Sequence, residues 1–152
     1  MIVSDQGIEF IKQWEGLSLQ SYLCPAHIWT IGYGSTHIFG RCVDKNDKIT
    51  PNEAENQLKI DLRQFEKIVS QNIFIELTQN QFDALVSHTY NTGGSETLFH
   101  LINTKSSKNE IRNWIESTYL TANGIILNGL IQRRKMEANL FFEDQKSRCP
   151  IE

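Results

Sequence analysis

The sequence predicts an α+β fold: a small N-terminal lobe with a β-hairpin or short antiparallel sheet, and a mainly helical C-terminal lobe, joined by a long helix. Three observations support this prediction. Apolar and polar residues alternate over residues 17–33, which is typical of strands. A helix-start pattern at Thr50 opens a long apolar stripe, and further capped helical segments follow from Thr78 onward.

The length and composition are those of one folded domain. With 152 residues and 39% hydrophobic content, the chain can bury a substantial core, and we expect a single domain over residues 1–152. Within it, the N-terminal lobe is predicted over about 12–50 and the linking helix over about 51–70. The helical lobe is predicted over about 71–152, together with the N-terminal helix.

A short helix is predicted before Glu15, with Ser4 as its N-cap and Gly16 as its stop. Its apolar residues recur at near-helical spacing: Ile8, Ile11 and Trp14. Glu15 is therefore expected at the C-terminal end of the helix, where unsatisfied carbonyl groups favour a protonated carboxyl group. Such a group can act as a general acid, although a helix-end glutamate can equally be an ordinary solvated residue.

A hairpin is predicted directly after this helix. Its strands alternate over residues 17–23 and 28–33, with a turn candidate at 24–27. Gly32 and Gly34 flank Tyr33. Because glycine has no side chain, this pattern indicates that a ligand or another segment of the chain approaches the backbone closely here.

The remaining elements are predicted mainly from helix-start signals. Residues 35–49 are interpreted as a third short strand plus a loop. A helix to about Ser70 begins with Thr50 as N-cap, Pro51 in the first position and Glu53 closing a capping box. The predicted elements after it are a helix from Thr78 to Gly93, a short helix over 95–103, a helix capped by Ser107, a loop or brief hairpin between the Asn-Gly pairs at 123–124 and 128–129, and a final helix from near Leu130.

Three stretches resemble one known family. Glu-Gly-x-x-Leu-x-x-Tyr from Glu15, followed by Thr-Ile-Gly-Tyr-Gly from Thr30, resembles the active-site segment of phage-type lysozymes (endolysins), glycoside hydrolase family 24. Residues 77–93 resemble the middle helix of that family, and Gly-Leu-x-x-Arg-Arg-x-x-Glu from Gly129 resembles its last helix. The resemblance covers about residues 8–142 and implies a lysozyme-like fold.

The resemblance also implies an activity. It implies an endolysin-type muramidase that hydrolyses β-1,4 bonds between N-acetylmuramic acid and N-acetylglucosamine in peptidoglycan. The implied catalytic residues are Glu15 as general acid, Thr30 as the residue that holds the water, and Cys24 at the place of the family's aspartate. Cys24 can be a hydrogen-bonding spectator, or its thiolate can attack the sugar or activate the water. A nearby carboxylate at Glu15 is expected to raise the pKa of the Cys24 thiol.

The candidate substrate-binding residues are Tyr22, Gly32, Tyr33, Arg133 and Arg134. Arg133 and Glu137 are four residues apart and can pair on one helical face. They can form a solvated pair, or one of the two arginines can contact the carboxylates or hydroxyls of the wall. His88 is expected to be a packed or surface-lining side chain.

Two other classes of protein stay open at this point. One is a catalytically weak or inactive lysozyme-like module that binds peptidoglycan or a host component, and the other is a purely structural protein. The intact Glu15 and Thr30 favour an enzyme, because a binding module has no need for an acid at a helix end.

Charge and cysteine spacing limit the partners. The net charge of −3 argues against a nucleic-acid binder. No stretch reaches 18 apolar residues, so no stable membrane association is expected. The widely spaced Cys24, Cys42 and Cys149 predict free thiols rather than a disulfide framework or a metal site, and no cofactor is expected.

The expected location follows from the N-terminus and the resemblance. The first residues lack the pattern of a signal peptide, so synthesis in the cytoplasm of a bacterial host is expected. Action on the periplasmic wall would follow release through a holin-type partner, which the resemblance alone implies. The protein is expected to be a monomer, and the tail after Phe142 is expected to be frayed until docked.

Overall fold

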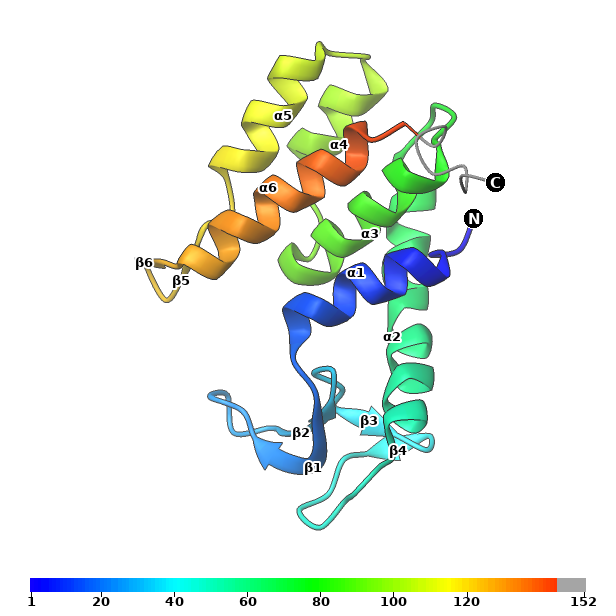
Figure 1. Ribbon diagram of the computed structural model, residues 1–152, viewed down its shortest axis with the longest axis vertical. Helices are drawn as coiled ribbons and strands as arrows, with labels where there is room; N and C mark the ends of the chain where they lie inside the picture. Colours follow the sequence, from blue (N-terminus) through cyan, green and yellow to red (C-terminus); the bar gives the residue numbers. More distant parts are fainter. Residues whose placement is uncertain (145–152) are drawn as a thin grey trace, which may run out of the picture. The chain divides into compact units, whose positions relative to one another are not determined.

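The computed structural model describes residues 1–144, and its mixed α+β architecture confirms the predicted fold class (Figure 1). The chain divides into two compact units. The sheet unit is Ile8–Arg63, and the helical unit is Met1–Gly7 together with the chain from Gln64 onward. Cys149 and most of the tail predicted to be frayed lie outside the described residues.

The first helix, α1 (Asp5–Glu15), begins and ends as predicted. The Ser4 hydroxyl accepts a hydrogen bond from the Gly7 N–H at 3.1 Å, which makes Ser4 the N-cap. Asp83 of the helical unit fixes this start, because its carboxylate accepts hydrogen bonds from the Ser4 N–H at 3.0 Å and from the Ser4 hydroxyl. The first turn of α1 is therefore tied into the helical unit.

The predicted hairpin is formed by β1 (Ser18–Leu23) and β2 (Trp29–Gly32), which pair antiparallel. Tyr22 lies opposite Thr30, and the register shifts toward Ser18 through a bulge. In the connecting turn, the Cys24 N–H donates to the Ile28 carbonyl at 3.0 Å and the His27 N–H to the Cys24 carbonyl at 2.8 Å. His27 has φ 59°, a left-handed conformation in which glycine is favoured.

The region predicted as one strand plus a loop contains a second hairpin instead, formed by β3 (His37–Ile38) and β4 (Arg41–Cys42). The two residues between the strands, Phe39 and Gly40, have φ 54° and 76°. Two positive φ values are typical of a type I′ turn, which usually contains Asn-Gly or Asp-Gly. The sequence prediction missed this hairpin because phenylalanine occupies the first turn position.

The long helix α2 (Pro51–Asn72) starts with the predicted capping box. The Thr50 N–H donates to Glu53 Oε1 at 3.0 Å, and the Glu53 N–H donates to Thr50 Oγ1 at 3.2 Å. Three aliphatic side chains of the sheet unit are fully buried: Ile11 of α1, Ile31 of β2 and Leu58 of α2. Full burial of a branched aliphatic side chain contributes about 1.5–3 kcal/mol to folding.

The helical unit is organised around α3 (Gln79–Thr92), which packs against α6 (Asn128–Phe142) (Figure 1). The predicted capping box of Thr78 and Gln81 is present, and Gly93 ends α3 with φ 88°. Two shorter helices, α4 (Glu96–Asn103) and α5 (Lys108–Ser117), pack against each other, and α5 also packs against α6. Both start as predicted, because the Ser95 and Ser107 hydroxyls accept N-terminal N–H groups.

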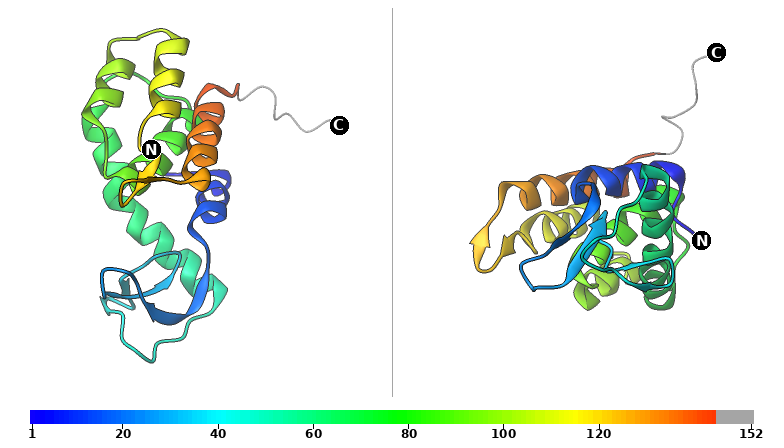
Figure 2. Two further views of the ribbon diagram at one scale, coloured as in Figure 1. Left: turned by 90° about the vertical axis from the view of Figure 1, so that its left-hand side faces the viewer. Right: turned by 90° about the horizontal axis from the view of Figure 1, so that it is seen from below.

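A brief hairpin of β5 (Thr121–Ala122) and β6 (Ile125–Ile126) connects α5 to α6, as Figure 2 also shows. The Asn123-Gly124 pair is the turn within this hairpin, with φ 52° and 77°. The hairpin thus lies on both sides of this pair rather than between the two Asn-Gly pairs as predicted, and Asn128-Gly129 opens α6 instead. The last helix starts at Asn128, two residues before the predicted start at Leu130.

Candidate active site

Glu15 is the last residue of α1 and is partly buried. Gly16 follows it with φ 65°, a left-handed conformation that ends the helix and leads into β1. The predicted position of Glu15, at a helix end directly before a hairpin, is therefore confirmed.

Cys24 and Thr30 meet on the β1–β2 hairpin. Cys24 lies at the end of β1, two residues after Tyr22, and Tyr22 faces Thr30 across the strands. Residues two apart share a face of a strand, so the thiol and the hydroxyl are diagonal neighbours on that face. The Thr30 side chain can form a hydrogen bond with the Cys24 thiolate. In this structure Thr30 Oγ1 donates to the Ile28 carbonyl at 3.0 Å, and the threonine is only 4% exposed.

The hairpin lowers the pKa of the Cys24 thiol below its ordinary value. The main cause is a backbone hydrogen bond at Ile28, and smaller contributions come from the Ala26 backbone and the Thr30 side chain. Desolvation acts in the opposite direction but is weaker. The expectation that this pKa would be raised was wrong in direction, because the turn donates hydrogen bonds that stabilise the thiolate.

The predicted substrate-binding residues of the sheet unit differ in accessibility. Tyr22 is 43% exposed on the hairpin, whereas Tyr33 is 7% exposed and lies under the Lys12 ammonium, 5.6 Å from its ring centroid. Gly32 has φ 67°, and an added Cβ would lie 3.4 Å from Ala54 Cβ. The bare backbone at Gly32 thus allows the close approach of α2, one of the two reasons that the sequence left open. Substrate contacts by these three residues stay predictions.

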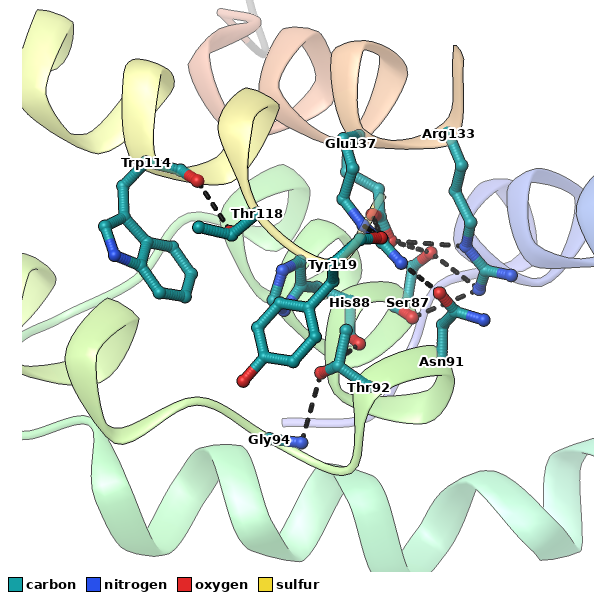
Figure 3. A network of polar contacts seen from close by, with 11 residues as sticks. Ser87, His88, Asn91, Thr92, Gly94, Trp114, Thr118, Tyr119, Arg133 and Glu137 are labelled. Atoms are coloured by element: carbon teal, nitrogen blue, oxygen red, sulfur yellow. Dashed lines mark hydrogen bonds and ion pairs between the residues drawn. The ribbon is translucent and has the colours of Figure 1, made fainter. Parts of the chain in front are cut away.

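Arg133 and Arg134 belong to the helical unit, where both are buried together with Glu137. Figure 3 shows Arg133 directed toward Ser87 and Glu137. The interpretation of Arg133 and Glu137 as a solvated pair was wrong. Arg133 Nε lies 3.5 Å from Glu137 Oε2, and Arg134 forms a closer ion pair with the other carboxylate oxygen. Burial raises the pKa of Glu137, and the two guanidinium charges and a hydrogen bond from Ser87 oppose that shift.

The ion pair is completed by neutral groups that sequence reasoning did not assign. The Ser87 hydroxyl donates to Glu137 Oε2 at 2.6 Å, and Arg133 Nη2 donates to the Ser87 carbonyl at 3.1 Å. Arg134 also donates to the Asn91 side chain. Breaking such a buried pair costs about 3–5 kcal/mol, because it leaves an uncompensated charge. This burial favours a structural role for both arginines, and a substrate contact by either stays a prediction.

His88, which follows Ser87, is a packed residue, one of the two alternatives expected. It is 2% exposed and lies against the rings of Trp114 and Tyr119, with centroids 6.3 and 5.6 Å away (Figure 3). Neither ring nitrogen has a hydrogen-bond partner within residues 1–144. Burial, followed by the charges of Arg134 and Arg133, lowers the pKa of His88 to about 3.

Among residues 1–144, no group of three or more histidine, cysteine, aspartate or glutamate side chains is arranged to hold a metal ion. No helix in the same range is both long enough and apolar enough to cross a bilayer.

A carboxyl group at a helix end before a hairpin, combined with a helical unit built on α3 and α6, is the arrangement expected from the family resemblance. The phage lysozyme family model matches residues 12–137, and the chain belongs to this family. It is 35% identical to the endolysin of Acyrthosiphon pisum secondary endosymbiont phage 1, over 93% of this chain and 98% of that protein.

Solved structures agree in fold. The endolysin from Escherichia coli O157:H7 phage FAHEc1 has a TM-score of 0.82 at 36% identity, covering 94% of each chain. The muramidase domain of SpmX from Asticaccaulis excentricus has a TM-score of 0.80 at 33% identity, covering 93% of this chain and 98% of that one. The chain spans about half the length, 54% and 55%, of the endolysins of Bacillus phages B103 and PZA. The predicted lysozyme-like fold is thereby confirmed.

Proposed function

We propose that this chain is an endolysin-type muramidase that hydrolyses the β-1,4 bond between N-acetylmuramic acid and N-acetylglucosamine in peptidoglycan. Membership of the phage lysozyme family over residues 12–137, a range that contains Glu15, Cys24 and Thr30, carries this proposal. The juxtaposition of Cys24 and Thr30 on one hairpin face supports it, because water activation and charge stabilisation require groups that act together.

Glu15 is proposed as the general acid. The leaving sugar oxygen needs a proton as the glycosidic bond breaks, and Glu15 is the carboxyl group that the family resemblance assigns to supply it. Partial burial keeps the group accessible to a substrate.

Thr30 is proposed to hold the attacking water. Its hydroxyl has one proton, which it donates to the Ile28 carbonyl in this structure, so its lone pairs stay available to accept from a water molecule. When Cys24 ionises, rotation of the same hydroxyl can direct the proton to the sulfur instead. The hydroxyl therefore couples the charge on Cys24 to the position of the water.

For Cys24 we propose participation as a thiolate rather than a spectator role. The transition state develops positive charge at the anomeric carbon, and a nearby anion stabilises it. The lowered pKa of the Cys24 thiol increases the anionic fraction at neutral pH, which supports this role. Attack on the anomeric carbon and activation of the water are both compatible with the thiolate.

The proposed route to the wall rests on the family resemblance. The protein is made in the cytoplasm of a bacterial host, and a holin-type membrane partner opens the path to the periplasmic peptidoglycan. We propose that it acts there as a monomer.

Replacement of Glu15 by glutamine tests the function. Glu15→Gln removes the transferable proton with little change of shape, so the rate of peptidoglycan hydrolysis should fall by about 10²–10⁴-fold, the contribution of general acid catalysis. Release of reducing sugar ends from purified peptidoglycan measures the rate, and thermal unfolding verifies the fold.

Glu9→Gln is the matched control, because Glu9 lies on the same helix, is exposed and pairs with Lys12 at 2.9 Å. It should retain the parent rate. Hydrolysis by Glu15→Gln at the parent rate, with an unchanged melting temperature, would exclude Glu15 as the acid. A parent protein that binds peptidoglycan but releases no reducing ends would instead indicate the binding module.

A further inference from the structure

The sheet unit contains a groove formed by the β3–β4 turn and one face of α2. Its volume is about 230 Å³, and its walls are the turn residues 38–40 and the helix residues Glu53, Asn56, Gln57 and Ile60. The helix residues are three or four positions apart, so they form one face. None of these residues belongs to the catalytic set proposed above.

Phe39 forms an exposed aromatic wall of this groove. It is 60% exposed and has φ 54°, although a left-handed backbone costs a bulky residue stability. Ile60 on the opposite wall is 50% exposed. A strained backbone that holds an apolar ring in solvent beside a second exposed apolar group indicates a binding surface rather than a packing requirement.

The polar groups around the groove are amides and a carboxylate. Within residues 1–144, the Asn56 amide makes no hydrogen bond. Glu53 uses Oε1 to accept from the Thr50 N–H, which leaves Oε2 to accept from a ligand. The Gln57 amide donates to Asp61 Oδ1 at 2.8 Å and is thereby held in place. Among the residues that the structure describes, no lysine or arginine lines the groove, so an acidic ligand would find no countercharge.

We propose that this groove binds a neutral N-acetylated sugar ring of the glycan strand, as a second contact in addition to the catalytic residues. The C–H face of a pyranose ring is apolar and packs on an aromatic face, whose negative potential attracts C–H groups. Its hydroxyl and acetamido groups can donate to Glu53 and exchange hydrogen bonds with Asn56. A small apolar pocket with a few placed polar groups is the usual form of such a site.

This inference rests on the proposed function for the identity of the polymer. Peptidoglycan presents many sugar rings on one strand, so a second contact raises the apparent affinity of the enzyme for the polymer without a change at the bond that is cleaved. The acidic and amide lining argues against an anionic membrane surface, which attracts basic residues.

Binding to purified peptidoglycan tests the site, in protein that also carries Glu15→Gln so that cleavage does not interfere. Phe39→Gly and Phe39→Ala should each weaken binding by about fivefold or more, because both remove the ring from the groove. Phe39→Gly should also raise the melting temperature, since glycine adopts the left-handed turn without strain. Loss of binding in a more stable variant cannot be attributed to misfolding.

Phe74→Ala is the matched control, because Phe74 is 82% exposed and belongs to the helical unit. It should bind as the parent does, and Phe39→Trp should retain binding. If Phe39→Gly binds peptidoglycan as tightly as the parent, or if Phe74→Ala weakens binding equally, the proposal is overturned.

Chitotetraose, a soluble chain of four N-acetylglucosamine rings, separates the groove from the catalytic proposal. NMR titration of the parent should shift the Asn56 and Gln57 side-chain amides, and Asn56→Ala should reduce the affinity. Absence of these shifts would also overturn the proposal. A failed Glu15→Gln test would remove the catalytic assignment but would leave these binding results unchanged.

Discussion

At residue level, Cys24, which the family resemblance places where an aspartate is expected, lies in an environment that favours the thiolate. The Ile28 backbone, and to a smaller extent the Ala26 backbone and the Thr30 side chain, lower the pKa of its thiol. All three belong to the same hairpin as Cys24. An ordinary thiol with a pKa near 8.5 is about 3% ionised at pH 7, so even a modest lowering multiplies the charge available to the reaction.

Two substitutions at Cys24 separate the possible roles. Cys24→Asp supplies a full negative charge at neutral pH, so the rate of peptidoglycan hydrolysis should rise or at least be retained. Cys24→Ser keeps a small hydrogen-bonding group without an accessible anion, so we expect a rate at least about tenfold lower. Initial rates on purified peptidoglycan between pH 6 and 8 provide the measurement.

The pH dependence of the hydrolysis rate tests whether the Cys24 thiolate takes part in the reaction. Because the thiolate forms as pH rises, the parent rate should increase with pH through the lowered pKa of Cys24. The exposed Cys42 serves as control, since Cys42→Ser should leave the rate unchanged. A serine variant at Cys24 as fast as the parent would show that the cysteine is a spectator.

At the level of elements, helix starts were predictable because they depend on local chemistry. Ser4, Thr50 and Thr78 each cap the helix that the sequence assigned to them. The β3–β4 hairpin was not predictable from turn residues, since Phe39 holds a conformation that usually requires asparagine or glycine.

The candidate site was also predictable where local sequence determines it and not where distant segments meet. Helix and strand periodicity predicted where Glu15, Cys24 and Thr30 lie in the sheet unit, because each is fixed by elements adjacent in sequence. Periodicity could not predict that Arg134 and Glu137 are buried, because their neighbours Ser87 and Asn91 lie about 50 residues away in sequence. The same limit applies to the donors that lower the pKa of Cys24, which depend on the geometry of the turn.

Gly7 provides a prediction for the junction of α1 with the helical unit. A Cβ at this position would lie 2.5 Å from Val3 Cγ1 and 2.6 Å from Asp83 Cγ. Gly7→Ala should therefore displace the Asp83 carboxylate from its hydrogen bonds to Ser4 and lower the free energy of unfolding by about 1–3 kcal/mol, the usual cost of overpacking. Urea denaturation measures the change.

Gly129→Ala is the comparison, because Gly129 lies in α6 and an added Cβ would have no neighbour within 4 Å. It should be neutral or stabilising by up to about 1 kcal/mol, since alanine has the higher helix propensity. Equal stability of Gly7→Ala and the parent would contradict the tight contact between α1 and Asp83.

For the whole molecule, His88 predicts a loss of stability in acid. Its pKa is about 3 in the folded protein and about 6.5 when unfolded, so between these values the unfolded chain binds a proton that the folded protein does not. As pH falls from 6.5 toward 3, the free energy of unfolding should decrease by up to about 1.4 kcal/mol per pH unit. The positive charges of Arg134 and Arg133 also oppose the protonation of His88. Glu137, whose pKa is raised in the folded protein, contributes to the pH dependence of stability with the opposite sign, because there the folded protein binds the extra proton.

His88→Phe isolates this contribution. The substitution removes the titrating group and two unpartnered ring nitrogens, so the slope of stability against pH should be smaller and stability at pH 7 should increase by about 1–3 kcal/mol. Denaturation curves between pH 4 and 7 measure both effects, with the exposed His100→Gln as control. An unchanged slope in His88→Phe would exclude the histidine as the source of acid sensitivity.

The helical unit is assembled from two stretches of chain that the sheet unit separates: Ser4 bonds to Asp83, 79 positions further along, and Val3 to Glu66, 63 positions further along. On the ribosome, the first turn of α1 emerges long before the partners that hold it. The sheet unit, continuous in sequence, can form while synthesis proceeds, but the helical unit must wait for α3 and α6. Closing so long a loop slows folding, so Val3 and Ser4 can join the helical unit only after Glu66 and Asp83 have been synthesised.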